Sequence, residues 1–393
     1  MLPSKLSVSP PENRLRRRQV LINASLAALA STALSPVQAQ DRRKIVLGQS
    51  CALTGAAAQL GQQMRIGAKL CFDAVNASGG VNGLQIELKT LDDGYEPERC
   101  KANTQAFIDE DVFALFGYVG TPTTLAALPL VNQAKIPLFA PLTGAQALRD
   151  PLSRWVFHVR ASYFEETALI VRQLTQLGLH RISVFHQNDS YGKAGLDGVL
   201  RALTPLGLSP IATSTVERNT VDVAKAVKDL VPASPEAIVM ISAYKSCAAF
   251  IRAARKAGFG GVFYNVSFVG TEALIEELGK DALGVVVSQV MPYPFGTVSG
   301  VASEYQTALY KANATGAGYK LDYNGMEGFL TAKVFVEGLR RMGRPSRDGL
   351  VGALESLQNY NVGGFPLHFT PAKHTASSFV ELTMLTGDGK VRR

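Results

Sequence analysis

The chain has 393 residues, of which 47% are hydrophobic and 18% charged. This composition is typical of a globular protein large enough for two domains with their own cores. The net charge is +8, but residues 1–39 alone contribute +4 through five basic residues and one acidic residue. Because no basic run with interleaved aromatic residues follows, the sequence does not indicate a nucleic-acid-binding protein.

Residues 1–39 have the pattern of an export signal peptide. Basic residues run to Arg18, an apolar stretch covers 20–34, and Val37-Gln38-Ala39 resembles a small-x-small cleavage site. The apolar stretch is shorter than the roughly 20 residues of a membrane span. The Arg17-Arg18 pair resembles a twin-arginine signal, with an ordinary Sec signal as the alternative. We expect a soluble, exported protein that starts near Gln40 in the periplasm.

Four cysteines (Cys51, Cys71, Cys100 and Cys247) allow three disulfide pairings in an oxidising compartment, and their spacing fits no metal motif. A chain of this length does not need crosslinks for stability, so we expect free and mostly buried thiols. The five histidines also lack metal-ligand spacing. We therefore expect neither a metal nor a cofactor.

The periodicity of apolar residues predicts alternating strands and helices from Lys44 onward. Strands are expected at 44–49, 84–91, 112–116, 136–140 and 155–160, with helices at 60–76, 97–109 and 123–134. This β-α-β order is typical of a parallel sheet with helices on both faces.

A second series begins near Ala161, which indicates a second lobe of similar architecture. Strands are expected at 181–186, 211–216, 237–243, 262–268 and 285–290, with helices at 164–177, 194–203, 221–230, 246–257 and 272–278. Three further helices (298–311, 325–342 and 348–357) and a closing hairpin at 379–389 follow.

The stretch from Val112 to Thr124 joins a buried strand to a helix through a glycine-containing turn. Thr121 is expected at the N-cap and Pro122 in the first helical turn. The free N–H groups and positive dipole end of such a helix suit an anion such as a carboxylate. In open α/β sheets ligands bind at this edge, although an ordinary threonine-capped turn is the alternative.

The sequence contains none of the motifs of serine hydrolases, P-loop proteins, zinc proteases or dinucleotide-binding enzymes. His186 is a candidate base, but a lone histidine at a strand end is more often a hydrogen-bonded wall residue. The adjacent Asp92 and Asp93 should point to opposite faces, and we interpret them as a solvated strand end. Loops with hydroxyl groups, glycines and tyrosines instead suit reversible binding of a small polar ligand. An enzyme is not expected.

Several segments together resemble the branched-chain amino-acid-binding (type I periplasmic binding protein) family of ABC-importer substrate-binding proteins. The resemblance covers about Lys44 to Leu385. It is carried by L-T-G-A-A-A-Q-L-G (53–61), F-D-A-V-N-A-S-G-G-V-N-G (72–83), L-D-D-G-Y-E-P (91–97), F-A-P-L-T-G-A (139–145) and Tyr191-Gly192.

The resemblance implies an α/β fold of two similar doubly wound parallel-sheet lobes, joined by a three-crossover hinge that closes like a clamp. We expect crossovers near Arg160, Met291 and Phe369. Lobe 1 is then 40–160 with 292–368, and lobe 2 is 161–291 with 369–393. The implied function is periplasmic capture of a small carboxylate-bearing ligand by a monomer that delivers it to a membrane permease. A ligand-sensing domain of a receptor or regulator and an exported α/β enzyme are the alternatives.

In the family, a serine or threonine at the position of Thr121 and the loop Leu142-Thr143-Gly144 hold the ligand α-carboxylate, while tyrosines at Tyr191 and Tyr244 come from the second lobe. Amino-acid binders of the family carry an acidic residue where Ser267 stands and a tyrosine where Leu60 stands. A buried ammonium without a carboxylate partner is costly, so an organic or aromatic acid without an α-amine is expected. An amino acid held by other acceptors is the alternative. The expected ligand-binding residues are Thr121, Leu142, Thr143, Gly144, Tyr191, Tyr244, Ser267, Leu60 and Tyr323.

Overall fold

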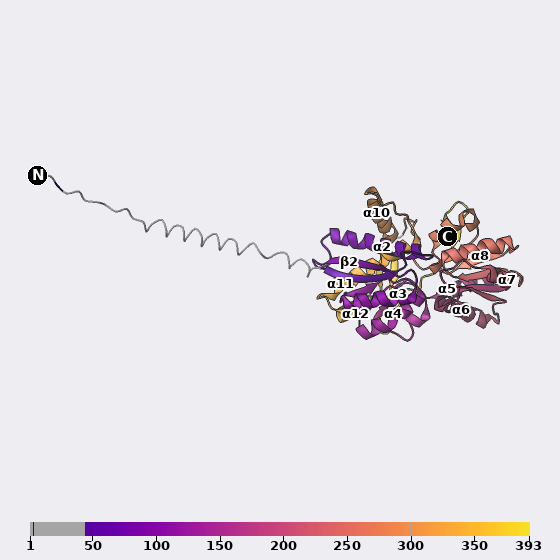
Figure 1. The fold of residues 1–393 in the computed structure, drawn as a ribbon, viewed down its shortest axis with the longest axis horizontal. Helices are drawn as coiled ribbons and strands as arrows, with labels where there is room; N and C mark the ends of the chain where they lie inside the picture. Colours follow the sequence, from indigo (N-terminus) through magenta and orange to yellow (C-terminus); the bar gives the residue numbers. More distant parts are fainter. Residues whose placement is uncertain (1–2, 4–43, 299) are drawn as a thin grey trace. The chain divides into compact units, whose positions relative to one another are not determined.

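The structure is a computed structural model that describes residue 3 and residues 44–298 and 300–393 (Figure 1). Apart from Pro3, the predicted signal peptide at residues 1–39 lies outside the described residues. Within the described residues, no helix has both the length and the apolar character needed to cross a membrane. Ile45–Arg393 forms one compact unit, and its first strand begins one residue earlier, at Lys44.

The first sheet has the strand order β2-β1-β3-β4-β5, and β1, β3, β4 and β5 pair in parallel. Helices α2, α3 and α4 connect its first four strands, and we call this sheet with its helices lobe 1. The elements are β1 (Lys44–Cys51), α2 (Ala58–Ala77), β2 (Gln85–Asp92), α3 (Pro97–Asp109), β3 (Ala114–Phe116), α4 (Thr121–Ala134), β4 (Leu138–Phe139), the 3₁₀ helix η2 (Gln146–Leu148) and β5 (Val156–Phe157).

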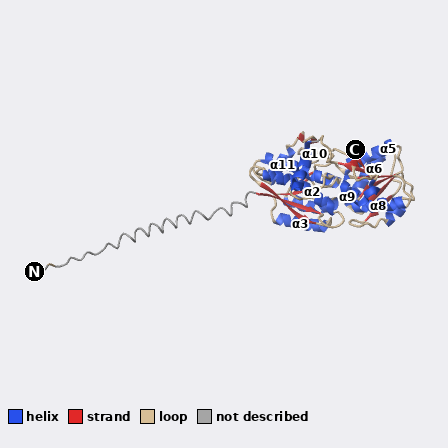
Figure 2. Cartoon of the chain, turned by 90° about the horizontal axis from the view of Figure 1, so that it is seen from above, coloured by secondary structure: helices blue, strands red, loops and turns tan. Residues whose placement is uncertain are grey.

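The second sheet repeats the same order in five parallel strands, β7-β6-β8-β9-β10, and defines lobe 2. Figure 2 shows the strands of the two sheets as separate groups, each flanked by helices. The elements are α5 (Tyr163–Gln176), β6 (Ile182–Gln187), α6 (Ser190–Leu203), η3 (Thr204–Leu206), β7 (Thr213–Val216), α7 (Ala224–Leu230), β8 (Ala237–Ile241), α8 (Tyr244–Lys256), β9 (Val262–Asn265), η4 (Ser267–Val269), α9 (Thr271–Leu278), η5 (Gly279–Ala282) and β10 (Val286–Gln289). The predicted α/β fold with two similar lobes is confirmed.

The chain then returns to lobe 1, where α11 packs against α2. The three predicted helices are present as α10 (Gly300–Ala314), α11 (Tyr323–Met342) and α12 (Arg347–Glu355). A small antiparallel pair, β11 (Tyr360–Val362) and β12 (Phe365–Leu367), was not predicted from the sequence. Its turn is Gly363-Gly364, both with positive φ, which is the backbone that a tight hairpin favours.

The last crossover leads from β12 to β13 (Glu381–Leu385), which pairs antiparallel with β10, and β14 (Val391–Arg392) pairs with β13. The predicted closing hairpin is therefore confirmed, and it extends the second sheet. Before reaching β13 the segment touches lobe 1, since the His374 carbonyl accepts from the His158 N–H at 2.7 Å and Ala376 N–H donates to the His158 carbonyl at 2.8 Å.

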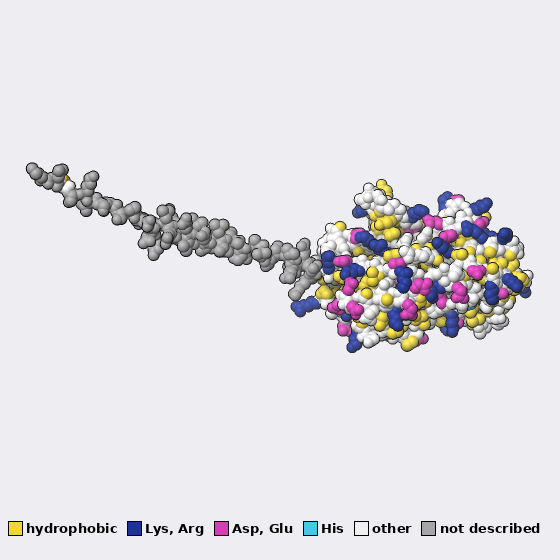
Figure 3. Space-filling model, viewed as in Figure 1, with side chains coloured by type: hydrophobic (Ala, Val, Ile, Leu, Met, Phe, Trp, Pro, Cys, Tyr) yellow, Lys and Arg dark blue, Asp and Glu magenta, His cyan; other side chains and the backbone are white. Residues whose placement is uncertain are grey.

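The core of lobe 1 contains stacked and edge-to-face phenylalanine rings contributed by β3, β4 and α11. All four cysteines are free and buried, as expected. At the surface, on the face shown in Figure 3, basic side chains are interspersed with acidic ones.

A group of polar contacts beside α3 joins the two lobes, and we call it the interlobe latch. Arg218 and Asn219 follow β7 in lobe 2, whereas Gly94 and Glu96 precede α3 in lobe 1. Arg218 Nη2 lies 2.8 Å from Glu96 Oε2. Asn219 Nδ2 donates to Glu96 Oε1 at 2.7 Å and to the Gly94 carbonyl at 3.1 Å. The described conformation is therefore one in which the lobes touch.

Two carboxyl groups meet where α9 of lobe 2 approaches the start of α11. Glu272 Oε2 accepts from the Tyr323 N–H at 3.1 Å, and Asp322 Oδ1 accepts from the Gly325 N–H at 2.5 Å. Burial raises the pKa of both groups, and the charge of Asp322 raises the pKa of Glu272 further. The pair therefore holds protons that ordinary carboxyl groups would release.

We predict that Arg218→Gln shifts the protein toward more open lobes. A partly exposed ion pair contributes about 0.2–1 kcal/mol, so the ratio of open to closed protein should rise about 1.5- to 5-fold. Small-angle scattering would show this as a larger radius of gyration. Arg252→Gln is the matched control, because Arg252 pairs with Asp281 inside lobe 2. Equal radii for wild type and Arg218→Gln would contradict a role of the latch in closure.

The carboxyl pair predicts a loss of stability as pH rises. A raised pKa means that folded protein keeps a proton that unfolded protein has lost above about pH 5, so the free energy of unfolding falls with pH until the folded group also ionises. Urea unfolding between pH 5 and 8 should show this fall, on the order of 1 kcal/mol or more. Glu272→Gln should reduce the fall, whereas Glu277→Gln, which changes another acid of α9 that is not among the main charges acting on the pair, should not. A pH profile unaltered in Glu272→Gln would contradict the prediction.

Candidate ligand-binding site

The loops that follow the parallel strands of the two lobes face each other. In each sheet the strand order reverses direction after its first strand, between β1 and β3 and between β6 and β8, which is where ligands bind in such sheets. Hydrogen bonds connect these loops across the lobes: Gln187 Nε2 donates to the Tyr95 hydroxyl at 3.3 Å, and Gln59 N–H donates to the Tyr244 hydroxyl at 3.4 Å. We call the buried region between them the interlobe site.

Thr121 and Thr143 provide paired hydroxyl groups on the lobe 1 side. Their Oγ1 atoms lie 2.6 Å apart, and both residues are fully buried. The expectation that Thr121 is the N-cap is wrong by one residue, since Gly120 takes that position with φ 105° and α4 begins at Thr121. Only glycine fits there, because a Cβ at Gly120 would come within 2.3 Å of the Tyr95 ring. The Thr121 hydroxyl is thus directed to Thr143 rather than to capping.

Leu142 and Gly144 shape the loop that carries Thr143. Leu142 N–H donates to the Tyr118 carbonyl at 2.7 Å, which fixes the loop beside the start of α4. The Gly144 carbonyl accepts from the Tyr163 N–H at 2.8 Å, and a Cβ on Gly144 would lie 2.6 Å from the Tyr163 ring. Leu142 and Gly144 therefore position neighbours, and Gly144 lets Tyr163 approach Thr143.

Tyr163 and Tyr191 bring two buried hydroxyl groups from lobe 2. Asp189 caps α6 and accepts from the Tyr191 N–H at 2.9 Å, so the Tyr191 ring enters the site at the first turn. The ring centroids of Tyr163 and Tyr191 lie 5.4 Å apart, and Tyr191 lies 4.6 Å from Phe268. Neither hydroxyl has a hydrogen-bond partner although both are buried. Burial raises the pKa of both tyrosines, so both hydroxyls remain neutral donors at pH 7.

Ser267 lies between an arginine and a glutamate. Arg160 Nη2 donates to Ser267 Oγ, which in turn donates to Glu166 Oε1 at 3.1 Å. Glu166 also accepts from the Ser267 N–H at 2.7 Å and from Ser288 Oγ at 2.6 Å. The sequence has a serine where amino-acid binders of the family carry an acid, yet the Glu166 carboxylate lies next to Ser267. Both oxygens of Glu166 already accept hydrogen bonds from the protein.

The aspartate pair after β2 braces the loop that presents Tyr95. Asp92 accepts from Leu53 N–H at 2.8 Å and from Thr54 Oγ1 at 2.6 Å. Although burial acts to raise it, these hydrogen bonds hold the pKa of Asp92 below its usual range. Asp93 is fully buried against Ser50 at 2.7 Å, and burial raises its pKa to about 6. The interpretation of the pair as a solvated strand end is wrong, because both carboxylates have structural partners.

The remaining predicted residues lie around the site. Leu60 is buried on α2 and contacts Gly270 of lobe 2. Tyr244 bonds the start of α2 across the lobes, as described above. Tyr323 lies instead next to the second crossover, where its ring is 6.4 Å from that of Tyr293. The structure thus brings Thr121, Thr143, Tyr191 and Ser267 to one buried region, whereas Tyr323 belongs to the carboxyl pair of Glu272 and Asp322.

Catalytic and metal-binding groups are sparse. His186 Nδ1 lies 3.1 Å from the Gln187 carbonyl, and burial lowers its pKa, which fits the wall residue expected from the sequence. Among the described residues, no group of three or more His, Cys, Asp or Glu side chains could hold a metal ion.

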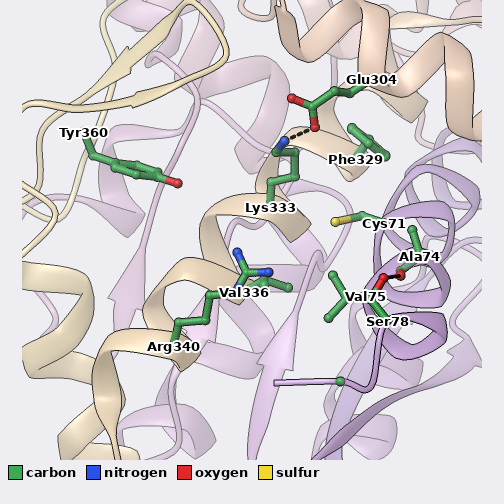
Figure 4. Close-up of a pocket in the computed structure, with 11 residues that line it drawn as sticks. Cys71, Ala74, Val75, Ser78, Glu304, Phe329, Lys333, Val336, Arg340 and Tyr360 are labelled. Carbon is green, nitrogen blue, oxygen red and sulfur yellow. Dashed lines mark hydrogen bonds and ion pairs between the residues drawn. The ribbon is translucent and has the colours of Figure 1, made fainter. Parts of the chain in front are cut away.

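A separate pocket of about 380 Å³ lies in lobe 1 between α2, α11 and β11 (Figure 4). Lys333, which is paired with Glu304, and Arg340 line it together with Cys71 and Tyr360. Because all its lining residues come from lobe 1, binding there would not bridge the lobes.

Sequence reasoning missed Arg160, Tyr163, Glu166 and Phe268. One signal was available: Ser162 and Glu165 form a capping box that fixes the start of α5 and therefore places Tyr163 and Glu166 in its first turn. Arg160 was read as the end of a strand, and β5 stops earlier at Phe157.

Comparisons with known proteins agree with this architecture. The sequence matches the family described as Periplasmic binding protein over residues 44–390. A possible leucine/isoleucine/valine-binding protein from Rhodopirellula baltica has a TM-score of 0.86 and 36% identity, covering 91% of this chain and 97% of that one. A substrate-binding periplasmic protein from Ralstonia solanacearum has a TM-score of 0.83 and 32% identity, covering 88% and 99%.

An amino acid binding protein from Pseudomonas aeruginosa is 24% identical over 262 residues, which are 66% of this chain and 70% of that relative. The resemblance seen in the sequence is thus confirmed by the family match over almost the whole described chain. This protein belongs to the periplasmic binding protein family, in its type I, branched-chain amino-acid-binding group.

Proposed function

We propose that this protein is the periplasmic substrate-binding component of an ABC importer, and that it captures a small carboxylate-bearing ligand between its lobes by hinge closure. The observation that carries the proposal is the interlobe site. Hydroxyl groups from both lobes converge there, and those of Tyr163 and Tyr191 are fully buried without a partner. Buried polar groups are normally hydrogen-bonded, so unpaired donors in a cleft mark the place of a polar ligand.

The ligand class at this level is an organic or aromatic acid, or an amino acid. Thr121 begins α4, whose dipole favours a carboxylate, and Thr143 in the loop after β4 bonds to it. The proposed lobe bounds are 40–160 with 292–368 and 161–291 with 369–393. The proposed ligand contacts include those expected from the sequence at Thr121, Thr143 and Tyr191.

The proposed setting is the periplasm, after removal of the signal peptide, with a membrane permease as partner and a monomer as the working form. We propose no catalysis, because the serine hydroxyls next to Glu166 form hydrogen bonds within the protein, and the family match is to binding proteins. The ligand should therefore be released unchanged.

The proposal predicts that small carboxylates stabilise the protein against heat. A ligand that binds only folded protein adds about 2.7 kcal/mol at a hundredfold excess over its dissociation constant. A thermal-shift screen of small organic, aromatic and amino acids should therefore yield at least one that raises the melting temperature, whereas the matching primary amides should not. Chromatography of the recovered ligand should show no new product. Turnover of the ligand, or equal shifts by acids and amides, would contradict the proposal.

Thr121→Ala should weaken binding of the acid found in that screen. The change removes a hydroxyl bond to a charged group, worth about 1.5–3 kcal/mol, which corresponds to about tenfold or more in affinity. Calorimetry measures this directly. Thr123→Ala is a matched control, because the Thr123 hydroxyl bonds backbone carbonyls of its own turn at 2.6 and 3.0 Å. An unchanged dissociation constant for Thr121→Ala would show that Thr121 only shapes the loop.

A further inference from the structure

Arg160 is a buried charged side chain that contacts residues of both lobes. It lies in the first crossover, directly before α5, and is only 2% exposed. Its Nη2 donates to Ser267 Oγ of lobe 2, and its Nε lies 3.5 Å from Glu327 Oε1 on α11 of lobe 1. Nη1 and Nε have no hydrogen-bond partner. A buried guanidinium with an open edge is costly unless an acceptor completes it.

The acids around Arg160 are Glu166 and Glu327, and the other buried cation is Arg149. Glu166 accepts three hydrogen bonds from Ser267 and Ser288. Arg149 directs its guanidinium to backbone carbonyls, including that of Arg160 at 3.1 Å. The two glutamates and two arginines balance in charge in the free protein. The N–H groups of Arg160 Nη1 and Nε are therefore available to an acceptor oxygen of a ligand.

The nearest uncharged groups are also donors. Tyr163 follows Arg160 by three residues at the start of α5, and Tyr191 packs against it. Burial raises the pKa of Tyr163 and outweighs the opposite effect of the Arg160 charge, so the phenol stays neutral. Arg160 Nη1 and the hydroxyls of the two packed tyrosine rings are therefore buried without a hydrogen-bond partner.

We infer that Arg160 is a specificity-determining residue that bonds an acceptor oxygen of the ligand next to its carboxylate, so that the site takes 2-oxo, 2-hydroxy or dicarboxylic acids rather than free α-amino acids. The inference rests on the proposed function and names the ligand class of the same site. Thr121 and Thr143 hold the carboxylate, and Arg160 with Tyr163 and Tyr191 holds the adjacent oxygen.

The charge of Arg160 also explains why an α-ammonium is excluded. An ammonium at this position would meet a like charge in a region of low dielectric, where the repulsion is far stronger than in water. The carboxylate of Glu166 already accepts three hydrogen bonds, which leaves about one acceptor position for the three N–H groups of an ammonium. A carbonyl or hydroxyl oxygen instead completes the donors that the free protein leaves unpaired.

Matched ligand pairs test this directly. Each pair has the same carbon skeleton and differs only in the group on the α-carbon: pyruvate with alanine, 2-oxoisovalerate with valine, phenylpyruvate with phenylalanine, and 2-oxoglutarate with glutamate. For the pair that binds, we expect the oxo acid to raise the melting temperature of the protein more than its amino acid does. Calorimetry should give an affinity for the oxo acid at least tenfold greater than for the amino acid. An amino acid that binds as tightly as its oxo acid, or more tightly, would overturn the inference while leaving the proposed function intact. Failure of every small carboxylate, here and in the broader screen, would overturn both.

Variants distinguish a role of Arg160 in binding the ligand from its role in holding the two lobes together. Tyr163→Phe removes one unpaired hydroxyl without disturbing an ion pair, and it should weaken the oxo acid about tenfold. Tyr305→Phe is the matched control, since it removes another buried hydroxyl without a partner, on α10. Arg160→Gln combined with Glu327→Gln removes one charge of each sign and should bring the affinities for the oxo acid and the amino acid together. An unchanged oxo-acid affinity in Tyr163→Phe would contradict the assignment even if the double variant fails to fold.

Discussion

The bond from the Arg160 guanidinium to Ser267, with the carboxylate of Glu327 beside it, is the interaction on which the site depends. Arg160 stands in the first crossover, Glu327 on a helix of lobe 1, and Ser267 after a strand of lobe 2. One side chain therefore touches both lobes and the hinge at once. Desolvating a guanidinium is tolerated only when its partners remain in place, so the network ties the geometry of the site to the relative position of the lobes.

The two sheets on either side of this network have equivalent strand orders. Each lobe has the same order of its first five strands, and each reverses its order next to its first strand. The loops at these two points meet, with tyrosine and threonine hydroxyls from both sides. Because the same local topology occurs twice, equivalent loops bound the buried region. The loops differ in their side chains, so the two sides of the region are chemically different: lobe 1 contributes the paired threonines, and lobe 2 contributes the packed rings of Tyr163, Tyr191 and Phe268.

The sequence predicted the alternation of strands and helices well, since buried parallel strands and amphipathic helices leave regular patterns. It also placed Thr121 and Thr143 just after strand ends, because glycine-containing loops after strands are local features. It did not find Arg160, Glu166 or the buried role of Asp93, because the burial of a charged side chain depends on partners far away in the chain. Glu166 and Ser267 are 101 residues apart, and no pattern within either segment signals their contact. The Gly120 cap was missed by one residue, since the positive φ and the Tyr95 contact that require glycine are set by tertiary packing.

The last crossover has a mechanical consequence. Its segment is hydrogen-bonded to His158 beside the first crossover, and it then enters the second sheet as β13 next to β10. The first and third connections are thus hydrogen-bonded to each other at His158. Only a few residues separate this contact from the next helix or strand of lobe 2 on each connection. A rotation of the lobes about this hydrogen-bonded pair of connections would swing the loops of Thr121 and Tyr191 apart while the backbone of Arg160 stays near the pivot.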